Sequence, residues 1–594
     1  MKIKHFFGLA VIAAMTASCS SNEDLGTAGS GTGTNEAGVG YVAFNINLPT
    51  QSGSSSRAGS ENDQFEAGTP NEYDVKDATL LIFEGSSESS ALFKGAYILN
   101  TAPWKDNGQT DNITTTSATI VKQIDTPASS DHCYALVVLN KNDVFTVDET
   151  AKTITLKDKT AAFSGTYKTF AESLSAESLT KKGFYMANAP LASKAGGATD
   201  PAGAEINTLA TLDGKIKETE SEAKSAPAQI YVERGVAKVT MQNTSTTPIT
   251  VAGSTKSDGT STVDFKITSW VLDNTNKKTY LVRSTDGFDN WTSLASNSTI
   301  PAANKYRFVG SNAVAANLYR TYFAKDANFD QTGNTAALTA GDLVTNTNPT
   351  FVDKFGNDNP QYCFENTFDA ACQKDQYTTR VLIKAKLNSG ETFYVFNGDQ
   401  NTIYPIDKVK NEIKKYYLIE NEAWIKANVT PATGKSEVNG DDLDVEITDA
   451  AGKVTITSIT FKSGVTVSSS ATVPTNYDEV LKRIGSIDEY KNGESYYFVR
   501  IKHFGDDMTP WNKDETTKPS ASSIYPEDNQ AGNYLGRYGV LRNNWYDIAV
   551  EGVKGLGSAV VPTVTPNTDD ELKSYIAVKI NVLSWAKRSQ NVTL

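Results

Sequence analysis

Short runs of β-branched and aromatic residues recur along most of this 594-residue chain, and they constrain its fold more than any other feature of the sequence. Clear examples are DATLLIFE at 77–84, CYALVVLN at 133–140, FKITSWVLD at 265–273, TRVLIKAKL at 379–387 and NWYDIAVEGV at 544–553. Clusters of Asn, Asp, Gly, Ser and Thr separate the runs, as turns between strands do. The pattern predicts an all-β protein with minor α content, built from antiparallel β-sandwiches with polar outer faces.

Turn-forming residues also divide the chain. The stretch 242–262 follows a strong strand pattern and is rich in Ser, Thr, Asn and Gly, so we place a domain boundary there, with an N-terminal sandwich at 58–245 and a C-terminal sandwich at 246–594. Helical patterns are few. They predict helices at 169–179, 314–325 and 477–486, which would decorate the sandwiches.

The first 18 residues have the basic start, the apolar run and the small final residues of an export signal. Cys19 follows, and the TASC that ends with it resembles a bacterial lipobox, which implies that acyl chains on Cys19 hold the precursor in a membrane. The next residues, SSNED, resemble the acidic tag of Bacteroidetes lipoproteins on the outside of the outer membrane. Residues 19–39 predict a flexible tether. No later run of 18 apolar residues follows, so lipid is the membrane attachment that the sequence implies.

Composition argues against two classes of function. The formal net charge is −13, and no basic cluster exists that could neutralise phosphates, so we expect no nucleic-acid partner. Beyond the signal, the histidines are His132 and His503, both inside strand-like runs. His132 adjoins Cys133, but neighbours in a strand point to opposite faces. We therefore expect no enzyme and no cofactor.

Two further features bear on metals and disulfides. The acid-rich stretch 439–452 resembles a calcium loop but carries Ile447 where such a loop needs glycine, so we predict a turn between strands and no metal. Cys363 and Cys372 are close enough in sequence to pair, and the sequence leaves open whether they do.

The stretch 40–57 combines a strand with an exposed loop. Val42, Phe44, Ile46 and Leu48 alternate with polar or small residues, which predicts a half-buried strand. Burying four such side chains contributes roughly 6–12 kcal/mol, comparable with the net stability of about 5–15 kcal/mol of a domain. The loop after the strand is small and polar, and Arg57 is the only basic residue between Lys4 and Lys76. A trypsin-like protease would therefore cut between Arg57 and Ala58 and release this strand.

The C-terminal end offers a replacement strand. Residues 574–594 contain one strand pattern and then a short second one that ends in Val592 and Leu594. If a terminal strand enters the vacated groove of the next molecule, main-chain hydrogen bonds hold it there. Because the two contacting surfaces differ, the contact need not close and builds an open filament.

Several motifs, in this order, resemble those of the fimbrillins of Bacteroidales type V pili, most closely the major subunit of the minor fimbriae. They are the first strand with RAG at 57–59, GTPNEYDVKDATLLIFEG at 68–85, YALVVLN at 134–140, VERGVAKV at 232–239, ITSWVLDNTNKKTYLV at 267–282, CFENT at 363–367, YGVLRNNWYDIAVEGVKGLG at 538–557, and the terminal VLSW and VTL. The resemblance implies two tandem transthyretin-like β-sandwich domains, lipoprotein export to the cell surface, cleavage at Arg57 and a donor strand at 586–594. Residues 286–360 resemble no family motif, and our hypothesis is that they shape the pilus surface.

The sequence thus predicts the shaft subunit of a cell-surface fimbria that supports adhesion. Its expected partners are further copies of itself, anchor and tip subunits, a trypsin-like protease and, through the lipid of the precursor, the outer membrane. Two alternatives remain open. One is an anchor or tip subunit of the same pilus, and the other is a surface glycan-binding lipoprotein.

Overall fold

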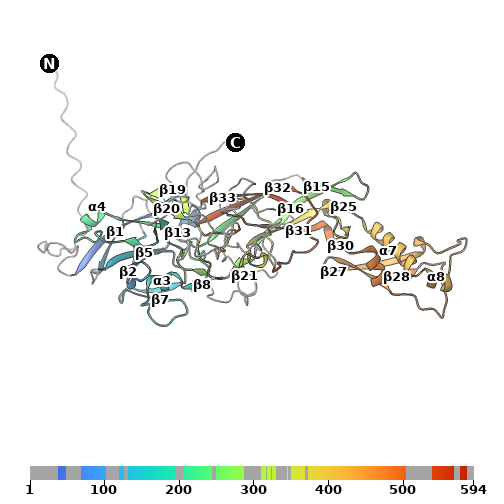
Figure 1. Cartoon of the computed structure of the whole chain (residues 1–594), viewed down its shortest axis with the longest axis horizontal. Coiled ribbons are helices and arrows are strands. Elements are labelled where there is room, and N and C mark those ends of the chain that lie inside the picture. Colours follow the sequence, from blue (N-terminus) through green and yellow to red (C-terminus); the bar gives the residue numbers. More distant parts are fainter. Residues whose placement is uncertain are drawn as a thin grey trace, which may run out of the picture.

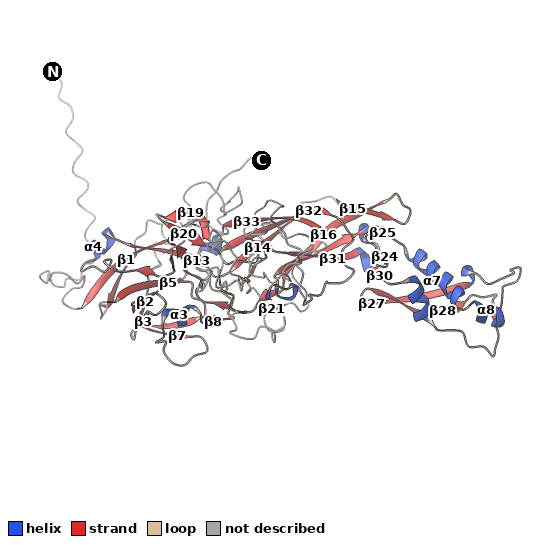
Figure 2. Ribbon diagram, in the orientation of Figure 1, coloured by secondary structure: helices blue, strands red, loops and turns tan. Residues whose placement is uncertain are grey.

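A computed structural model describes residues 38–47, 69–101, 120–125, 131–195, 205–243, 249–285, 309–315, 317–322, 324–329, 344–345, 349–367, 372–503, 538–566 and 576–584. The molecule is elongated, with the first strands at one end and a lobe containing helices at the other (Figure 1). Strands are the main regular secondary structure in the described residues, far ahead of helices (Figure 2), which confirms the all-β prediction. Within the described residues, no helix has the length and apolar character needed to cross a membrane.

The N-terminal part contains an eight-stranded sheet. In spatial order its strands are β3 (Leu92–Ile98), β2 (Ala78–Gly85), β5 (His132–Leu139), β9 (Met186–Asn188), β13 (Ala228–Arg234), β1 (Val39–Asn47) and β4 (Ile120–Asp125), and β12 (Ala210–Thr211) also pairs with β5. The hairpin β6 (Phe145–Asp148) and β7 (Thr153–Leu156), α1 (Pro70–Tyr73), α3 (Tyr167–Ala171) and α4 (Glu220–Ser225) accompany it. Both faces of β2, and of β5 from Ala135 onward, are buried in the core, as expected of strands that consist mostly of apolar residues.

The second part is a sandwich of two sheets around its own core. One sheet has the order β22 (Gln361–Cys363), β14 (Ala237–Gln242), β32 (Asn544–Val553) and β33 (Ile576–Ser584). The other has the order β25 (Thr402–Ile403), β15 (Ile249–Lys256), β16 (Thr262–Asp273), β23 (Arg380–Leu387) and β31 (Glu494–Arg500). Strand pairs β1 with β13, β14 with β32 and β15 with β25 are parallel, so the sheets are mixed rather than purely antiparallel. Each parallel pair joins distant segments that no hairpin constrains.

The prediction placed the domain boundary at 245/246, and the strand pairing moves it. Strand β13 belongs to the first sheet and β14 to the second sandwich, so the chain crosses between them at Gly235 and Val236. Within the polar stretch 242–262, β14 ends at Gln242, and residues 249–262 form β15 and the turn into β16. The turn-forming residues there mark a hairpin within the second sandwich and not a boundary between domains.

A third lobe is inserted in the second sandwich, and the sequence did not predict it. It carries the sheet β24 (Phe393–Phe396), β30 (Ile487–Tyr490), β28 (Lys453–Phe461) and β27 (Leu443–Ala450), the pair β26 (Val429–Thr430) and β29 (Thr466–Val467), and helices α7 (Ile406–Glu420), α8 (Glu422–Asn428) and α9 (Tyr477–Ile484). Val409, Ile413 and Tyr417 of α7 are buried in a core of this lobe. Their spacing of four residues is the signal that could have revealed α7. The supposed calcium loop forms a capped turn and then β27.

Of the three predicted helices, one is confirmed, one is shorter than predicted and one is wrong. The prediction at 477–486 is confirmed by α9, whereas at 169–179 the helix is α3 alone, followed by β8 (Leu174–Ser175), which pairs with β18 (Thr279–Tyr280). The helix at 314–325 is wrong, because this segment forms the hairpin of β19 (Val309–Ala315) and β20 (Leu318–Thr321). Asn317 has a φ of 58° and marks the tight turn that the helical reading overlooked.

Part of the segment 286–360 lies inside the protein, contrary to our hypothesis of a surface role for all of it. Strand β20 pairs with β10 (Leu191–Ala192), which pairs with β11 (Ile206–Asn207), and β21 (Val344–Thr345) pairs with β17 (Thr275–Asn276). Arg320 and Asp326 are almost completely buried. This material therefore ties the first part of the chain to the second.

Candidate functional site

Strand β1 occupies an interior position in the first sheet. Along Phe44 to Asn47 it runs parallel to β13, and along Val39 to Phe44 it runs antiparallel to β4. Among the described strands, β4 pairs with β1 alone. Removing β1 would therefore leave the edge of β13 without a partner and would detach β4 from the sheet.

The side chains of β1 form part of the main apolar core. Val42, Phe44 and Ile46 are 0%, 0% and 1% exposed. Tyr41 and Asn45, which the pattern placed on the other face, are half-buried, while Ala43 is buried as well. The fourth predicted residue of this strand, Leu48, lies outside the described residues, as do the predicted lipidation residue Cys19 and the predicted cleavage residues Arg57 and Ala58.

The N-terminal half of β1 does not pair with β13, and the chain at Lys217 bonds to it on that side instead. Tyr41 and Lys217 exchange two backbone hydrogen bonds, with N–O distances of 2.8 and 2.9 Å. Directly afterwards, α4 packs beside β1. Thr219 begins this helix with a capping box, in which its hydroxyl accepts from the backbone N–H of Glu222 and its own N–H donates to the Glu222 carboxylate. The strand is therefore bonded along both edges.

The C-terminal strand β33 lies at the edge of its sheet. It pairs antiparallel with β32 from Val553 opposite Ile576 to Asn544 opposite Ser584. This part of the C-terminal segment is therefore held by its own chain. The predicted donor residues Val592 and Leu594, within 586–594, lie outside the described residues.

The two histidines contact other polar side chains, and the three described cysteines are buried. His132 Nδ1 lies 2.5 Å from Asp213 Oδ2, and His503 Nδ1 lies 2.8 Å from the Tyr546 hydroxyl. Cys133 is buried on the other face from His132, and burial raises the pKa of its thiol to about 12. Cys363 and Cys372 are also buried, and no disulfide joins cysteines of the described residues. A thiol with so high a pKa is a poor nucleophile.

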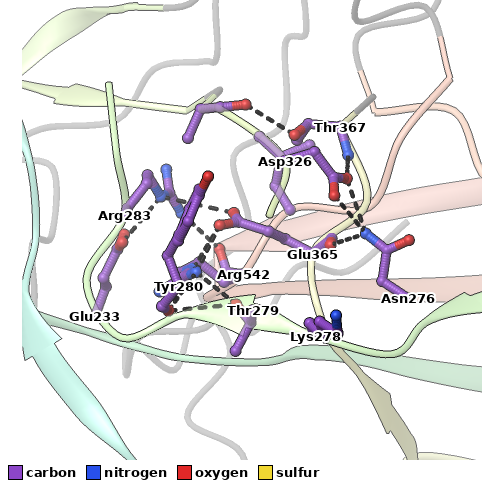
Figure 3. A network of polar contacts seen from close by, with 12 residues as sticks. Glu233, Asn276, Lys278, Thr279, Tyr280, Arg283, Asp326, Glu365, Thr367 and Arg542 are labelled. Atoms are coloured by element: carbon purple, nitrogen blue, oxygen red, sulfur yellow. Dashed lines mark hydrogen bonds and ion pairs between the residues drawn. The ribbon is translucent and has the colours of Figure 1, made fainter. Parts of the chain in front are cut away.

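A network of buried charges joins the two parts of the chain, and the sequence did not predict it (Figure 3). Arg283 Nε lies 2.9 Å from Glu233 Oε1, and Arg542 Nε donates to Glu365 Oε1 at 2.8 Å. All four side chains are at most 4% exposed. Arg283 also donates to the backbone oxygen of Arg542 at 3.1 Å, which connects the two pairs.

Neutral groups and a third buried carboxylate, that of Asp326, complete this network. Arg542 Nη2 donates to Thr279 Oγ1 at 2.8 Å, and the buried carboxylate of Asp326 accepts from Asn276 Nδ2 and from the backbone N–H of Thr367. Desolvation raises the pKa of Asp326 and of Glu233. Charges buried this deeply persist in proteins when ion pairs and hydrogen bonds compensate them.

A second buried ion pair stands beside the first. Lys238 Nζ lies 2.9 Å from Glu72 Oε1, both side chains are 0% exposed, and the ammonium group lies 3.7 Å from the centre of the Trp545 ring. Tyr362 donates its hydroxyl to the same carboxylate, and Arg234 Nε donates to the backbone oxygen of Glu72. Several of the motifs quoted above contribute here: Glu72, Glu233, Arg234, Lys238, Glu365, Arg542 and Trp545 all come from them.

Glu88 connects the turn after β2 to the chain just before β12. Its carboxylate accepts from the backbone N–H groups of Thr208 and Leu209, at 2.9 and 2.8 Å. Burial raises the pKa of Glu88 to about 7, although the two N–H groups act in the opposite direction. The carboxylate thus titrates near neutral pH.

A pH-dependent stability follows from Glu88. Its pKa in the folded protein, about 7, lies above the ordinary value of 4.5, so its contribution to the free energy of unfolding is fully present below about pH 4.5 and is lost as the pH rises through 7. We expect urea unfolding at several pH values to show this loss in the parent protein and not in Glu88→Gln. The exposed Glu149, substituted by Gln, is the control. An equal difference between parent and Glu88→Gln at pH 4.5 and pH 8 would contradict the assignment.

Comparison with known protein families gives a match at the C-terminal motifs. Residues 523–591 match the family model described as major fimbrial subunit protein type IV, fimbrillin, C-terminal. No curated protein sequence matches the chain. The match makes the C-terminal part of this all-β chain similar to fimbrillins. The resemblance of the C-terminal motifs to those of fimbrillins is confirmed by this match.

Among solved structures, three are similar to this chain at low identity and low TM-score. A putative cell adhesion protein from Parabacteroides distasonis has 11% identity and a TM-score of 0.31, with 93% of this chain and 98% of that chain covered. A putative cell adhesion protein from Bacteroides eggerthii has 11% identity and a TM-score of 0.31, with 92% and 95% covered. The tip fimbrial protein Mfa3 from Porphyromonas gingivalis, with C-terminal truncation, has 9% identity and a TM-score of 0.29, with 92% and 100% covered.

Proposed function

We propose that this chain is a structural pilin, the shaft subunit of a cell-surface fimbria that supports adhesion. In this proposal the precursor is a lipoprotein acylated at Cys19, a trypsin-like protease cuts between Arg57 and Ala58, and residues 586–594 of one molecule fill the groove that β1 leaves in the next. Anchor and tip subunits complete the pilus. The fimbrillin family match supports the role as a pilin.

The observation that carries the proposal is the interior position of β1. Val42, Phe44 and Ile46 are buried between β13 and β4, and burial of three such side chains contributes roughly 5–9 kcal/mol. A groove of this kind cannot stay empty in water, because its apolar walls and its two unpaired strand edges both need a partner. A strand from another copy supplies both kinds of contact.

Limited proteolysis tests the proposal directly. We expect a low dose of trypsin to produce a new N-terminus at Ala58 and then ladders of polymers on gels of unheated samples. Arg57→Ala should stay uncut and monomeric, and a chain without residues 586–594 should be cut but should not polymerise. Polymers of uncut Arg57→Ala protein would refute strand replacement as the route of assembly.

A further inference from the structure

A groove of about 1170 Å³ lies on the first sheet, and its lining includes residues 228–231 of β13, the stretch that pairs with β1. Its floor carries Tyr134 of β5 and Tyr231 of β13. These two rings lie on the same face of the sheet. Tyr134 and Val138 share a face because they are four residues apart in one strand, and Val138 pairs with Ala187 of β9. Ala187 in turn pairs with Glu233, which shares a face with Tyr231 because the two are two residues apart. At this end of the sheet, β12 pairs with β5 and also contacts β13. The groove is larger than the roughly 300–1000 Å³ typical of small-molecule sites.

The two tyrosines are available to a ligand. Both side chains are half-buried, and neither hydroxyl has a hydrogen-bond partner within the described part of the chain. The ring of His132 lies 6.2 Å from that of Tyr134, on the same wall. An aromatic ring that presents an apolar face and a polar edge suits ligands with the same mixture, and sugar rings have it.

Hydrogen-bonding groups surround these rings. Exposed amides of Asn207 and Gln229 can each donate and accept, and Asp213 adds a carboxylate whose position is fixed by His132 and by the backbone N–H of Cys133. Groups that donate and accept side by side match adjacent sugar hydroxyls, which do the same.

The charge of the lining favours an uncharged ligand. Its acidic residues are Glu88, Glu172, Glu205 and Asp213, and its basic residues are Lys168, Lys215 and the buried Arg283, with His132 paired to Asp213. Arg283 is already paired with Glu233 in the buried network. An anionic saccharide would therefore meet more carboxylates than accessible cations.

A peptide strand fits the groove less well. Strand addition needs an open sheet edge, but the floor here is the face of a paired sheet, with β12 bonded to β5 and β13 bonded to β1. A sheet face with aromatic rings and amides offers stacking and side-chain hydrogen bonds instead. We propose that this groove binds a neutral oligosaccharide, so that the subunit itself carries an adhesive site. The proposal goes beyond assembly of the pilus and does not depend on cleavage at Arg57.

Titration of the uncleaved full chain with neutral oligosaccharides tests the proposal. The probes are a panel of oligosaccharides of glucose, galactose, mannose, fucose and N-acetylhexosamines, each with a sialylated counterpart where one exists, measured by isothermal titration calorimetry. We expect at least one neutral member to bind with a dissociation constant below about 1 mM. Its sialylated counterpart should bind more weakly.

Variants locate the binding. Tyr134→Ala and Tyr231→Ala should each weaken it roughly tenfold, and Tyr134→Phe should weaken it less because the ring remains. Tyr416→Ala, at a half-buried ring of α7 in the distant lobe, should leave it unchanged. Circular dichroism checks that each variant folds, and polymerisation after trypsin is scored separately, so a failure of this proposal and a failure of assembly are told apart. Absence of binding by every neutral probe, or binding that both tyrosine substitutions to Ala leave intact, would overturn the proposal.

Discussion

Replacing Arg542 with alanine is expected to lower the free energy of unfolding by about 3–5 kcal/mol. The guanidinium pairs with Glu365 and donates to Thr279, and the carboxylate of Glu365 is 4% exposed. Without Arg542 a buried negative charge would lose its nearest partner, since Arg283 Nε is 3.8 Å from the other oxygen of Glu365. Urea unfolding of the uncleaved chain measures the loss.

Two further variants test whether the loss of stability in Arg542→Ala comes from leaving a buried charge without its partner and not from the loss of an ion pair as such. Arg483 pairs with Glu420 at 2.6 Å, but its side chain is 63% exposed, so Arg483→Ala should cost at most about 1 kcal/mol. The double variant Arg542→Met with Glu365→Leu removes both charges and should lose less stability than Arg542→Ala alone. If Arg542→Ala cost no more than Arg483→Ala, the network would not be a major source of stability.

Replacing Phe44 with alanine is expected to cost about 3–5 kcal/mol. Phe44 is 0% exposed and lies where β1 is paired on both sides, with Ala228 of β13 and with Ile120 of β4. The lost ring would leave a cavity in the main core, and the paired strands limit its collapse. Urea unfolding of uncleaved protein measures the change.

A matched change on the other face of the same strand is the control. Asn47 is half-buried and its amide donates to a backbone oxygen only two residues away, so Asn47→Ala should change stability by about 0.5 kcal/mol or less. In our assembly proposal, cleaved Phe44→Ala protein should also polymerise faster than the parent, because the leaving strand is held less tightly. A loss below about 1 kcal/mol for Phe44→Ala would contradict the central place of β1 in the core.

Local patterns in the sequence predicted local structure well. The alternation of Val42, Phe44 and Ile46 is a property of one strand, and the burial of these residues follows it. The stripe of Val409, Ile413 and Tyr417 is likewise a local pattern, and it indicates a helix with one buried face. At 314–325 the helical pattern was overruled by pairing of β20 with both β10 and β19.

Features assembled from distant segments were not predictable from one sequence. Glu233, Arg283, Glu365 and Arg542 form a network, but in the sequence each is an isolated charge, and charged residues are usually exposed. The quoted motifs did mark the segments that meet there, without showing that they meet. The groove of Tyr134 and Tyr231 is likewise built by strands that are far apart in the chain.

The inserted lobe leaves and rejoins its sandwich at neighbouring strands. Lys386 near the end of β23 lies directly opposite Glu494 at the start of β31. The chain therefore departs and returns at almost the same point, the arrangement in which modules are inserted into a host domain. Between these points β25 pairs back with β15 of the sandwich, so an exchanged module would have to keep that strand. Related subunits could carry quite different appendages at this position while keeping one common scaffold, and an engineered passenger domain could be carried there in the same way.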